Sequence, residues 1–426
     1  MLSYIVLNNI YPYKMNKRLK IILANKYFYI KGGSERAFFD EARILREHGH
    51  EVAFFSMDDE KNLPSPQSRY FVDRVEYNNP LGLREKISHV SKLLYSFEAK
   101  KKITDLISQE KPDLVHLHNI HHQLSPSIIH AVKKKNIPIV MTLHDYKMVC
   151  PVYTLVRGGQ ICEECGKGRY YRCIVNRCTK DSFYKSLINM AEMYLHHRIL
   201  NIYDLVDIFI SPSYFLKEKM KAMGFDRTII TLPNSLDDRL YEPEYNPRDD
   251  PVSLCFFGRL SALKGLFTLI EAMKGLDAEL KIIGDGPLKD ELEKKINADK
   301  KLRIKFLGYK SGNELKTEIR KCSVVIVPSE WYENYPYTIV ESFGLGKPVV
   351  ASRTGGIPEL VKDYETGLTY NPGDIDDLHA KLLILLRDHS LRTKMGKQAR
   401  QFVEENLTFD KHYQGLMKIY KMALDR

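Results

Sequence analysis

The sequence predicts an α/β protein of two domains, each a doubly wound parallel sheet, that face a central cleft. Its 426 residues are enough for two domains of ordinary size. Short apolar runs of strand length alternate with helical segments in the N-terminal half, and the alternation starts again after residue 250. Between the two series lies Leu232–Asp250, a segment rich in Pro, Asn and Asp that is typical of a linker. Such alternation indicates parallel strands covered by helices.

The expected elements follow from the apolar and amphipathic segments. In the N-terminal half we expect strands at Lys20–Ala24, Glu51–Ser56, Leu114–Leu117, Ile139–Leu143 and Asp207–Ser211, with helices at Ser34–His48 and Ile128–Lys135. In the C-terminal half we expect strands at Val252–Phe257, Leu280–Ile283, Ile304–Leu307 and Val324–Val327, with helices at Leu266–Met273, Leu288–Ile296 and Glu314–Lys321. The last segment, Thr408–Leu424, carries aromatic residues at helical spacing and predicts a final amphipathic helix.

These elements divide the chain into four parts. Residues 1–14 are expected to be an N-terminal extension outside the fold pattern, with the fold starting near Met15. Residues 15–235 form the first domain and include a cysteine-rich insertion at about 150–180. Residues 236–407 form the second domain, and residues 408–426 form the final helix.

Composition narrows the class of protein. No apolar run is long enough for a transmembrane helix, and the start lacks the basic region that precedes the apolar part of a secretory signal. The net charge is +11, and the whole basic excess lies in residues 1–235. This asymmetry favours attraction to a membrane surface, a nucleic acid or a phosphorylated substrate, although solvated lysines without a partner explain it as well.

Two carboxylates lie in the segment WYENYPYTIVE, which follows the last apolar strand of the series. Glu333 is expected on the strand-to-helix loop and Glu341 about two turns into the helix. Ligands of open α/β sheets bind beyond the carboxyl ends of the strands. Carboxylates accept hydrogen bonds from sugar hydroxyls and helix-terminal amides donate to phosphate, so this segment suits a ligand that carries both.

Two further turns in the same half have the composition of an anion site. The segment FGRLSALKG follows a strand and opens a helix, with Gly258 for a close backbone approach and with Arg259 and Lys264 as cations for a diphosphate. The segment IIGDGP, which contains Asp285, is explained as a tight β–α turn or as backbone contact with a nucleotide.

The N-terminal half offers a glycine pair and several histidines. Gly33, in KGGSER, opens a helix after the first strand, where backbone amides can approach an anion. In VHLHNIHH, strand alternation places His118 nearer the carboxyl end than His116, so His118 is the better ligand contact. A neutral histidine there could position a hydroxyl or a phosphate, and a metal site built from these histidines is the rival interpretation.

Five of the seven cysteines cluster in the insertion. Four of them, Cys162, Cys165, Cys173 and Cys178, could hold a structural zinc ion, although their spacing differs from common zinc ribbons. A disulfide-bonded hairpin and free thiols remain alternatives. Arginines, lysines and tyrosines crowd the same insertion, which fits a loop that contacts an acceptor or a membrane.

The motifs GGSE, HLHN, HD, GRLSALKG, GDGP, the E-x7-E pair and GGIPELV together resemble the family 4 glycosyltransferases. These are retaining enzymes of the fold called GT-B, which has two Rossmann-like domains. The resemblance runs from about Met15 to the end, and the C-terminal motifs are the more specific ones. The insertion after HDYKMVCPV is similar to one in members that build bacterial surface polysaccharides.

The resemblance implies roles for these residues. The second domain would bind a nucleoside diphosphate sugar, with Arg259 and Lys264 on the diphosphate, Glu333 on the sugar and Glu341 on the ribose. The remaining contacts implied are Gly33 with phosphate or acceptor, His118 with the donor sugar, Gly258 and Asp285 with the nucleotide, and the amides of Tyr337, Thr338 and Ile339 with phosphate. Catalysis would need no cofactor and no metal, and the final helix would pack on the first domain.

We therefore expect a retaining glycosyltransferase that acts on a lipid-linked glycan in capsule, exopolysaccharide or lipopolysaccharide synthesis. It would be a cytoplasmic, peripheral protein on the inner face of the membrane, drawn there by anionic lipid and with no nucleic-acid partner. One departure concerns the donor, because Pro336 stands in a loop that is usually glycine-rich in the family and lacks an N–H. The alternatives are a nucleotide-sugar epimerase of the same fold and a noncatalytic, basic sugar- or nucleic-acid-binding protein.

Overall fold

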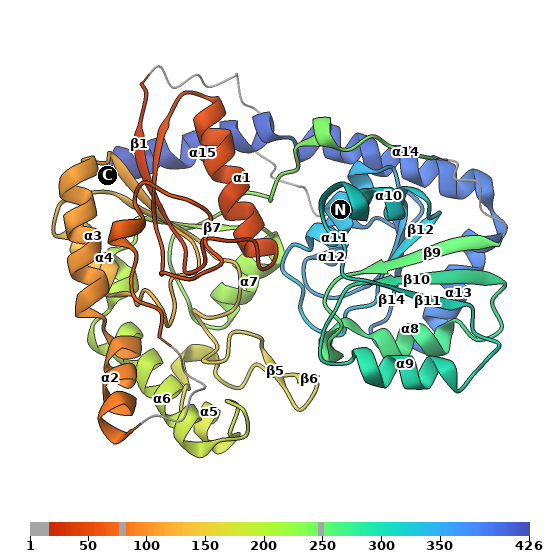
Figure 1. Cartoon of the computed structure of the whole chain (residues 1–426), viewed down its shortest axis with the longest axis horizontal. Helices are drawn as coiled ribbons and strands as arrows, with labels where there is room; N and C mark the ends of the chain where they lie inside the picture. The colour runs from red at the N-terminus through yellow and green to blue at the C-terminus, as the bar shows by residue number, and fades with distance from the viewer. Residues whose placement is uncertain (1–16, 76–81, 246–250) are drawn as a thin grey trace. The chain divides into compact units, whose positions relative to one another are not determined.

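The structure is a computed structural model that describes residues 17–75, 82–245 and 251–426, without side chains for 83–87. The proposed extension 1–14 and the start near Met15 lie outside the described residues. The chain forms two compact units (Figure 1). The first comprises the chain up to Thr154, Glu163–Pro233 and Asp410–Arg426, and the second comprises Leu155–Cys162 and Asn234–Phe409.

The first unit is a six-stranded parallel sheet with the order β2-β1-β3-β4-β7-β8. Its strands are β1 Lys20–Ala24, β2 Glu51–Phe55, β3 Leu114–Leu117, β4 Ile139–Thr142, β7 Ile208–Ser211 and β8 Ile229–Thr231. Its helices are α1 Gly33–Glu47, α2 Leu83–Leu94, α3 Phe97–Glu110, α4 Ser127–Lys133, α5 Arg172–Val175, α6 Phe183–Tyr194, α7 Tyr214–Ala222 and α15 Phe409–Leu424. Strand order reverses between β1 and β3, so the loops after these two strands flank a switch point.

The second unit repeats the architecture with the order β11-β10-β9-β12-β13-β14, again all parallel. Its strands are β9 Val252–Phe257, β10 Ala278–Ile283, β11 Ile304–Gly308, β12 Val324–Val327, β13 Val349–Ser352 and β14 Gly367–Tyr370. Its helices are α8 Leu266–Ala272, α9 Lys289–Asn297, α10 Gly312–Arg320, α11 Tyr337–Gly344, α12 Ile357–Leu360, α13 Ile375–Arg387 and α14 His389–Asn406. Here the switch point lies between β9 and β12.

The predicted fold class is confirmed, and the predicted strands lie within two residues of the observed ones. Apolar runs such as VVIV in β12 are buried on both faces, which is why they carry no alternation. The sequence prediction missed two strands, β14 and β8, and in β8 only Ile229 is buried. Among the helices it missed α2, α3, α5, α6, α7, α12, α13 and α14. It also missed a two-stranded hairpin inside the insertion, formed by β5 Val156–Arg157 and β6 Gln160–Ile161.

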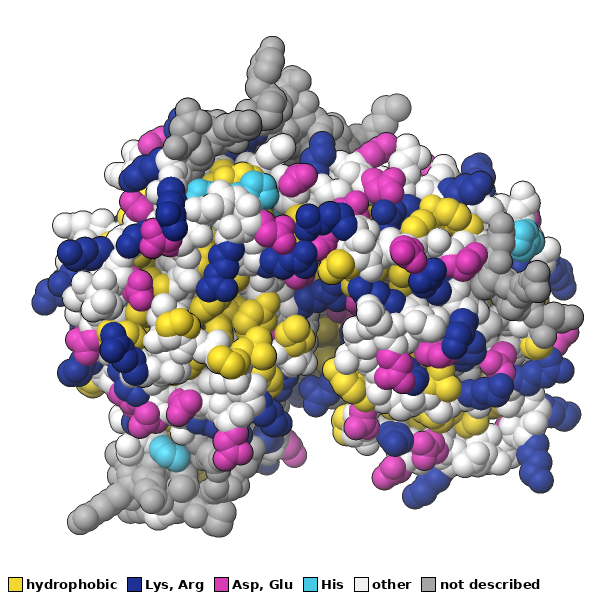
Figure 2. Space-filling model, turned by 45° about the horizontal axis from the view of Figure 1, so that its top comes forward, with side chains coloured by type: hydrophobic (Ala, Val, Ile, Leu, Met, Phe, Trp, Pro, Cys, Tyr) yellow, Lys and Arg dark blue, Asp and Glu magenta, His cyan; other side chains and the backbone are white. Residues whose placement is uncertain are grey.

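Basic and acidic side chains are interspersed over the face of the molecule seen in Figure 2. The net charge of +11 is therefore not gathered into one patch on that face. Within the described ranges, none of the helices combines the length and the apolar character needed to span a bilayer.

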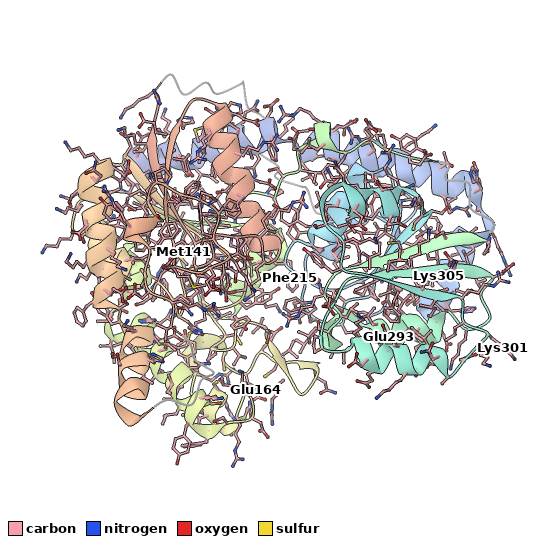
Figure 3. All side chains as sticks on the ribbon, viewed as in Figure 1. Met141, Glu164, Phe215, Glu293, Lys301 and Lys305 are labelled. Atoms are coloured by element: carbon pink, nitrogen blue, oxygen red, sulfur yellow. The ribbon has the colours of Figure 1, made fainter. Side chains whose placement is uncertain are left out.

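Charged side chains protect the edge of the second sheet. β11 is an edge strand, and its Lys305, labelled in Figure 3, pairs with Glu279 of β10 at 2.5 Å. Lysine on an edge strand discourages pairing with strands of other molecules.

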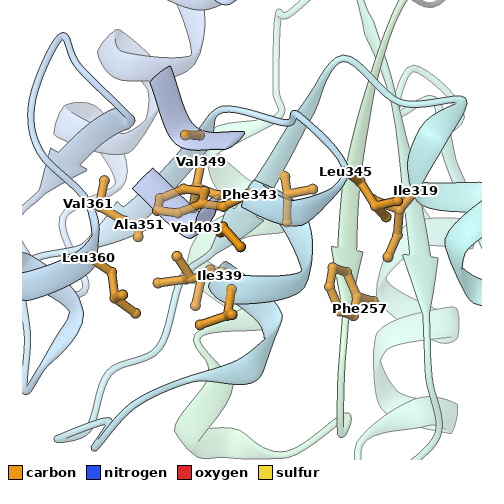
Figure 4. Packing of buried hydrophobic residues seen from close by; sticks show 14 of the residues in the cluster. Phe257, Ile319, Ile339, Phe343, Leu345, Val349, Ala351, Leu360, Val361 and Val403 are labelled. Carbon is orange, nitrogen blue, oxygen red and sulfur yellow. The ribbon is translucent and has the colours of Figure 1, made fainter. Parts of the chain in front are cut away.

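The core of the second unit packs α11 and α14 against the sheet (Figure 4). Phe343, Ile339 and Val403 are fully buried there. The segment expected to be a linker contributes to the same core, because Leu236 and Tyr241 are 0% and 4% exposed. Arg400 of α14 donates to the carbonyl oxygen of Tyr241 at 2.6 Å. From Asn234 onward, the described residues of this segment thus belong to the second unit.

The C-terminal helix α15 packs on the core of the first unit. Leu416, Met417 and Tyr420 are fully buried in the cluster that contains Leu19 and Phe38. His412 of α15 donates a hydrogen bond from Nδ1 to the carbonyl oxygen of Pro233 at 2.9 Å. The last 17 residues are therefore part of the first unit, although they follow the second unit in sequence.

A buried ion pair fastens the insertion to the first unit. Lys147 Nζ lies 2.7 Å from Glu192 Oε2, and the two side chains are 3% and 0% exposed. His122 Nε2 lies 3.3 Å from the same carboxylate oxygen, and Lys147 also donates to the carbonyl oxygen of Pro151. His122, the last histidine of VHLHNIHH, therefore has a structural partner in Glu192.

Lys147→Met should destabilise the protein strongly, because it leaves the Glu192 carboxylate buried without its ammonium partner. We expect a loss of about 3–5 kcal/mol in unfolding free energy, measured by urea denaturation. The control is Lys101→Met, which removes an exposed pair with Asp105 and should lose less than about 1 kcal/mol. Equal losses in the two variants would contradict the structural role of the buried pair.

Candidate functional site

Glu333 lies on the loop between β12 and α11, at the switch point of the second sheet. Its residue is 6% exposed. Three donors converge on Oε1: Lys264 Nζ at 2.5 Å, Ser329 Oγ at 2.6 Å and Trp331 Nε1 at 2.9 Å. All three hydrogen bonds fall on one oxygen, which leaves Oε2 as the acceptor for a further donor.

Lys264 and its neighbours keep this carboxylate ionised. Burial raises the pKa of Glu333, but the Lys264 ammonium and the hydrogen bonds from Ser329 and Trp331 outweigh it and lower the pKa below its usual value. The site therefore combines a fixed negative charge after β12 and a partly exposed ammonium after the neighbouring strand β9.

The glycine pair of GGIPELV braces the Glu333 loop. Gly356 N–H donates to the carbonyl oxygen of Glu333 at 2.7 Å. Gly355 has φ +60°, and a Cβ there would lie 2.1 Å from the same oxygen. A side chain at Gly355 is therefore excluded by the backbone that positions Glu333.

The loops after β9 and β10 touch through their backbones. Gly284 has φ +148°, and a Cβ there would lie 1.9 Å from the carbonyl oxygen of Gly258. Arg259 follows Gly258 and is exposed at the switch point. The Asp285 carboxylate accepts from Gly286 N–H at 2.8 Å, so in this structure it closes its own turn.

Helix α11 presents its N-terminus on the same loop. Pro336 precedes the helix, and its carbonyl oxygen accepts from Ile339 N–H at 3.0 Å, so the amides of Tyr337 and Thr338 open the first turn. Glu341 lies just over one turn into the helix, not two, and accepts from the hydroxyl of Tyr241 at 3.0 Å. The two carboxylates therefore share one strand–loop–helix segment but have different partners.

In the first unit, Gly33 is exposed at the start of α1, at the carboxyl end of β1. His118 follows β3, but its side chain is 0% exposed. The half-buried histidine at this edge is His144, which follows β4 and which the sequence analysis did not select. His118 Nδ1 lies 2.9 Å from His144 Nε2, so the two rings are directly linked.

Behind them lies a buried carboxylate, Glu41 of α1. Its Oε2 is 3.2 Å from both His116 Nδ1 and His118 Nε2, although neither Glu41 Oε2 nor His118 Nε2 has a well-aligned hydrogen bond. Burial lowers the pKa of His116 to about 3. Burial opposes ionisation of Glu41, yet His116 and His118 hold its pKa well below the usual range. The cluster is an ionised carboxylate among imidazoles.

This cluster is also where the rival metal hypothesis is tested. In the part of the chain that the structure describes, only Glu41, His116 and His118 bring three such ligand atoms within 4.8 Å of one another. Both ring nitrogens of His116 already have partners, because Tyr420 OH and Thr142 Oγ1 each lie at 2.8 Å. We therefore interpret the cluster as a hydrogen-bonded network.

The proposed zinc site is not supported by the structure. Cys165 and Cys173 are buried in one small cluster against which Cys178 packs, whereas Cys162 is half-exposed at the end of the β5–β6 hairpin. No three cysteine sulfurs among the described residues reach metal-ligand spacing. The C-x-x-C pattern was misleading because the hairpin directs Cys162 away from the other three positions.

The sequence analysis selected Glu333, Glu341 and Lys264 but not the residues that form hydrogen bonds with them. Ser329 and Tyr241 are ordinary polar residues without a motif, so no sequence signal marks them. Glu41 sits on the buried face of an amphipathic helix, four residues after Ala37. A carboxylate at a core position is the signal that could have identified it.

Two family profiles match the chain. The profile described as Glycosyl transferases group 1 matches residues 237–402. The profile described as Glycosyltransferase Family 4 matches residues 31–240. Together they span residues 31–402, which include His118, Lys264 and Glu333.

Curated relatives extend over most of the chain. An uncharacterized glycosyltransferase of Methanocaldococcus jannaschii is 28% identical over 353 residues, which are 82% of this chain and 87% of the relative. An uncharacterized 42.6 kDa protein in the cps region of Klebsiella pneumoniae is 26% identical over 80% of this chain and 87% of its own length.

Solved structures show the same fold. Sucrose-phosphate synthase from Thermosynechococcus elongatus superposes with a TM-score of 0.71 at 19% identity, covering 95% of this chain and 98% of that one. HepE of Anabaena, solved with UDP-glucose, superposes with a TM-score of 0.65 at 18% identity, covering 95% and 100%. The fold is that of the GT-B glycosyltransferases.

Gly355→Ala should displace the Glu333 loop, because the new methyl group overlaps the Glu333 carbonyl oxygen. Trp331 is the only tryptophan and donates to Glu333, so its fluorescence reports on this loop. We expect a shifted emission spectrum and a loss of about 2–4 kcal/mol in unfolding free energy.

The matched control for that variant is Gly373→Ala. Gly373 has φ +77° but no atom within 4 Å of the position of a Cβ, so it shares the backbone strain without the clash. It should lose about 1 kcal/mol and leave the Trp331 emission unchanged. If both variants lose the same unfolding free energy and change the Trp331 emission equally, the inference that Gly355 supports the Glu333 loop is wrong.

Proposed function

The chain belongs to the group 1 and family 4 glycosyltransferases, and on this premise we propose that it transfers a sugar from a nucleoside diphosphate sugar to a lipid-linked glycan with retention of configuration. The observation that carries the proposal is the Lys264–Glu333 pair beside the N-terminus of α11. A cation, helix amides and a carboxylate at one switch point match a donor with both phosphates and hydroxyls.

We assign the diphosphate to the cations and the helix. Lys264 and Arg259 would neutralise its charge, and the amides that open α11 at Tyr337 and Thr338 would donate to a phosphate oxygen. Ile339, whose amide bonds to Pro336, would contribute less than the sequence suggested. Lys264 would keep its hydrogen bond to Glu333 and donate another to the diphosphate, since one ammonium carries three hydrogens.

The sugar and the ribose are assigned to the carboxylates. Glu333 Oε2 would accept from hydroxyls of the donor sugar, while Ser329 and Trp331 hold Oε1 in place. Glu341, which accepts from Tyr241 in this structure, would accept from the ribose. Buried acceptors of this kind discriminate strongly against ligands that lack the matching hydroxyl.

The chemistry proposed is substitution on the face from which the leaving group departs. The diphosphate oxygen leaves as the acceptor hydroxyl attacks, and it takes the proton of that hydroxyl. Lys264, Arg259 and the α11 amides would stabilise the charge that develops on the diphosphate, which is the main barrier to be lowered. Glu333 is placed to bind hydroxyls, so it is not assigned as an acid or a nucleophile.

The nature of the donor and the acceptor is inferred from relatives. HepE was solved with UDP-glucose, so UDP-sugars are the first donors to test. The Klebsiella relative is encoded in a cps region, which supports a role in capsule or related surface polysaccharide synthesis. A nucleotide-sugar epimerase, the rival within this fold, would convert the donor when no acceptor is added.

The acceptor would be reached at the inner face of the cytoplasmic membrane. Helices α5 and α6, with the residue that precedes α5, carry five exposed apolar side chains, among them Val175 at 66% and Tyr184 at 75% exposure. We call them the α5–α6 face; its members are Tyr171, Val175, Phe183, Tyr184 and Leu187. Arg177, Lys180 and Lys185 are exposed in the same stretch, and aromatic residues mixed with cations favour an anionic bilayer surface.

A UDP-sugar that is the donor should raise the melting temperature of the protein. Lys264→Ala should abolish that shift and lower kcat/KM by at least about 100-fold, because the diphosphate loses its main cation. Lys305→Ala removes an exposed lysine of the same unit and should leave both quantities unchanged. Full activity of Lys264→Ala would refute the assignment of the site.

Replacing Phe183 and Tyr184 together by Ser should reduce binding to vesicles that contain anionic lipid. Flotation of the protein with anionic and with neutral vesicles measures this, and we expect at least about a tenfold loss with the anionic ones. Tyr309→Ser removes an equally exposed tyrosine from the second unit and should have no effect. Binding that does not depend on lipid charge or on the α5–α6 face would contradict the proposal.

A further inference from the structure

The short helix α5 ends in a backbone turn that brings two cysteines together. Arg177 follows the C-cap residue Asn176 and has φ +46°, in the left-handed region. Cys178 N–H donates to the carbonyl oxygen of Cys173 at 3.1 Å. Arg177 N–H donates to the carbonyl oxygen of Ile174 at 3.0 Å. These two hydrogen bonds, together with a left-handed residue at the helix end, define a Schellman motif.

The motif determines which side chains touch. A Schellman motif usually carries a side-chain contact between the residue at its last position and the residue five positions earlier. Here those positions hold Cys178 and Cys173, and Cys178 packs against the small buried cluster that contains Cys173. A hydrogen bond with the Cys178 thiol lowers the pKa of Cys173 below the usual thiol value. The backbone of the turn itself therefore holds the two sulfurs side by side.

The two thiols differ in how a dissolved molecule reaches them. Cys173 is 0% exposed, whereas Cys178 is half-buried on the turn that follows α5. Reactive cysteines are partly exposed ones whose surroundings stabilise a thiolate. Cys178 is thus the sulfur that an oxidant in solution meets first, and Cys173 is its enclosed partner.

The same turn connects α5 to α6 through hydrogen bonds. Thr179, the residue after Cys178, donates its N–H to Ser186 Oγ at 3.0 Å. Asn189 Nδ2 donates to Thr179 Oγ1 at 2.9 Å. A covalent bond between the two sulfurs would therefore restrict a segment that is attached to both helices of the α5–α6 face.

We propose that Cys173 and Cys178 are a site of reversible oxidation, at which a hydroperoxide converts the two thiols into a disulfide that closes the turn between α5 and α6. This inference goes beyond the proposed function, because it depends on neither the donor nor the acceptor. Disulfides inside cells are usually transient, so the bond formed here is one that thiol reductants open again.

The step balances with a hydroperoxide as the oxidant. The Cys178 sulfur attacks one peroxide oxygen and the O–O bond breaks, which releases an alcohol, or water from hydrogen peroxide, and leaves a sulfenic acid. The Cys173 sulfur then attacks the Cys178 sulfur, and the hydroxyl group leaves as water. Two S–H bonds and one O–O bond are lost, and one S–S bond and two O–H bonds are formed. The sulfurs lose two electrons, which the peroxide oxygens gain.

Trypsin digestion gives a direct readout of the bond. Trypsin cleaves after arginine and lysine, so Cys173 and Cys178 fall on separate peptides, CIVNR and CTK. The native protein is reduced and treated with hydrogen peroxide, and its remaining thiols are blocked before digestion. We expect mass spectrometry to show these two peptides joined as the main disulfide, and dithiothreitol to separate them again. A disulfide from Cys173 to Cys165, or thiols that stay free, would overturn the proposal.

A second pair of neighbouring thiols is the matched control. Cys255 and Cys322 share a hydrogen bond, but both are 0% exposed in the core of the second unit. Under the same treatment this pair should stay reduced in the folded protein, because the oxidant does not reach it. Equal oxidation of both pairs would mean that unfolding, and not the turn after α5, exposes the sulfurs, and the proposal would be wrong.

Two serine variants assign the roles of the thiols. Cys178→Ser removes the thiol that the oxidant reaches, so the joined peptides should vanish and Cys173 should remain a thiol. Cys162→Ser removes another half-buried cysteine, the residue after β6, and should leave the disulfide unchanged. Loss of the disulfide in Cys162→Ser would contradict the proposed pairing. So would stoichiometric zinc held by these cysteines in the reduced protein.

Hydrogen exchange measures the effect on the turn. The disulfide limits the open states of the segment between α5 and α6, so the amides of Cys178 and Thr179 should exchange at least about tenfold more slowly in the oxidised protein. The amides of α9, in the second unit, should exchange equally fast in both forms. If the disulfide forms but the exchange of Cys178 and Thr179 is unchanged, the inference that it closes the turn is wrong.

Discussion

A single carboxylate oxygen, Glu333 Oε1, organises the second unit at its switch point. It takes hydrogen bonds from Lys264, Ser329 and Trp331, so it holds the loops after β9 and β12 to each other. A buried carboxylate is tolerated only with such a set of donors. The same contacts hold Lys264 against the loop that leads into α11. The glycine at 355 is required by this arrangement, because backbone rather than a side chain supports the loop.

Each unit contains a buried, ionised carboxylate, and the surroundings that stabilise its charge differ between the two units. In the second unit an ionised carboxylate lies at the surface of the site and is balanced by an ammonium. In the first unit the ionised carboxylate, Glu41, lies behind the site and is surrounded by imidazoles. Imidazole rings linked by hydrogen bonds can fix which atom of the next ring donates and which accepts, without bringing net charge to the surface.

The fold was predictable from sequence because strands buried on both faces are continuous apolar runs. β9 and β12 were predicted to the residue, and β8 was missed because only Ile229 of its three residues is buried. Glu333 and Lys264 could be selected from the sequence because each is a charged residue close to the end of an apolar strand. Charged residues are uncommon in segments that only form a core. His144 was not selected, since the sequence does not show that His118 is buried while His144 is partly exposed. Cys162 was assigned to a cluster it does not join, because spacing along the chain does not reveal the hairpin between β5 and β6.

The order of the chain has a consequence for biosynthesis. The first unit includes Asp410–Arg426, which follow the second unit in sequence, so its core acquires Leu416, Met417 and Tyr420 only after the whole second unit has been synthesised. Domains usually fold in the order in which they emerge. Here the unit that emerges first is the last to be completed, and the second unit can fold while the first still exposes the surface that α15 will cover. A message that ends early yields a chain with an unfinished first unit, however intact the second unit is.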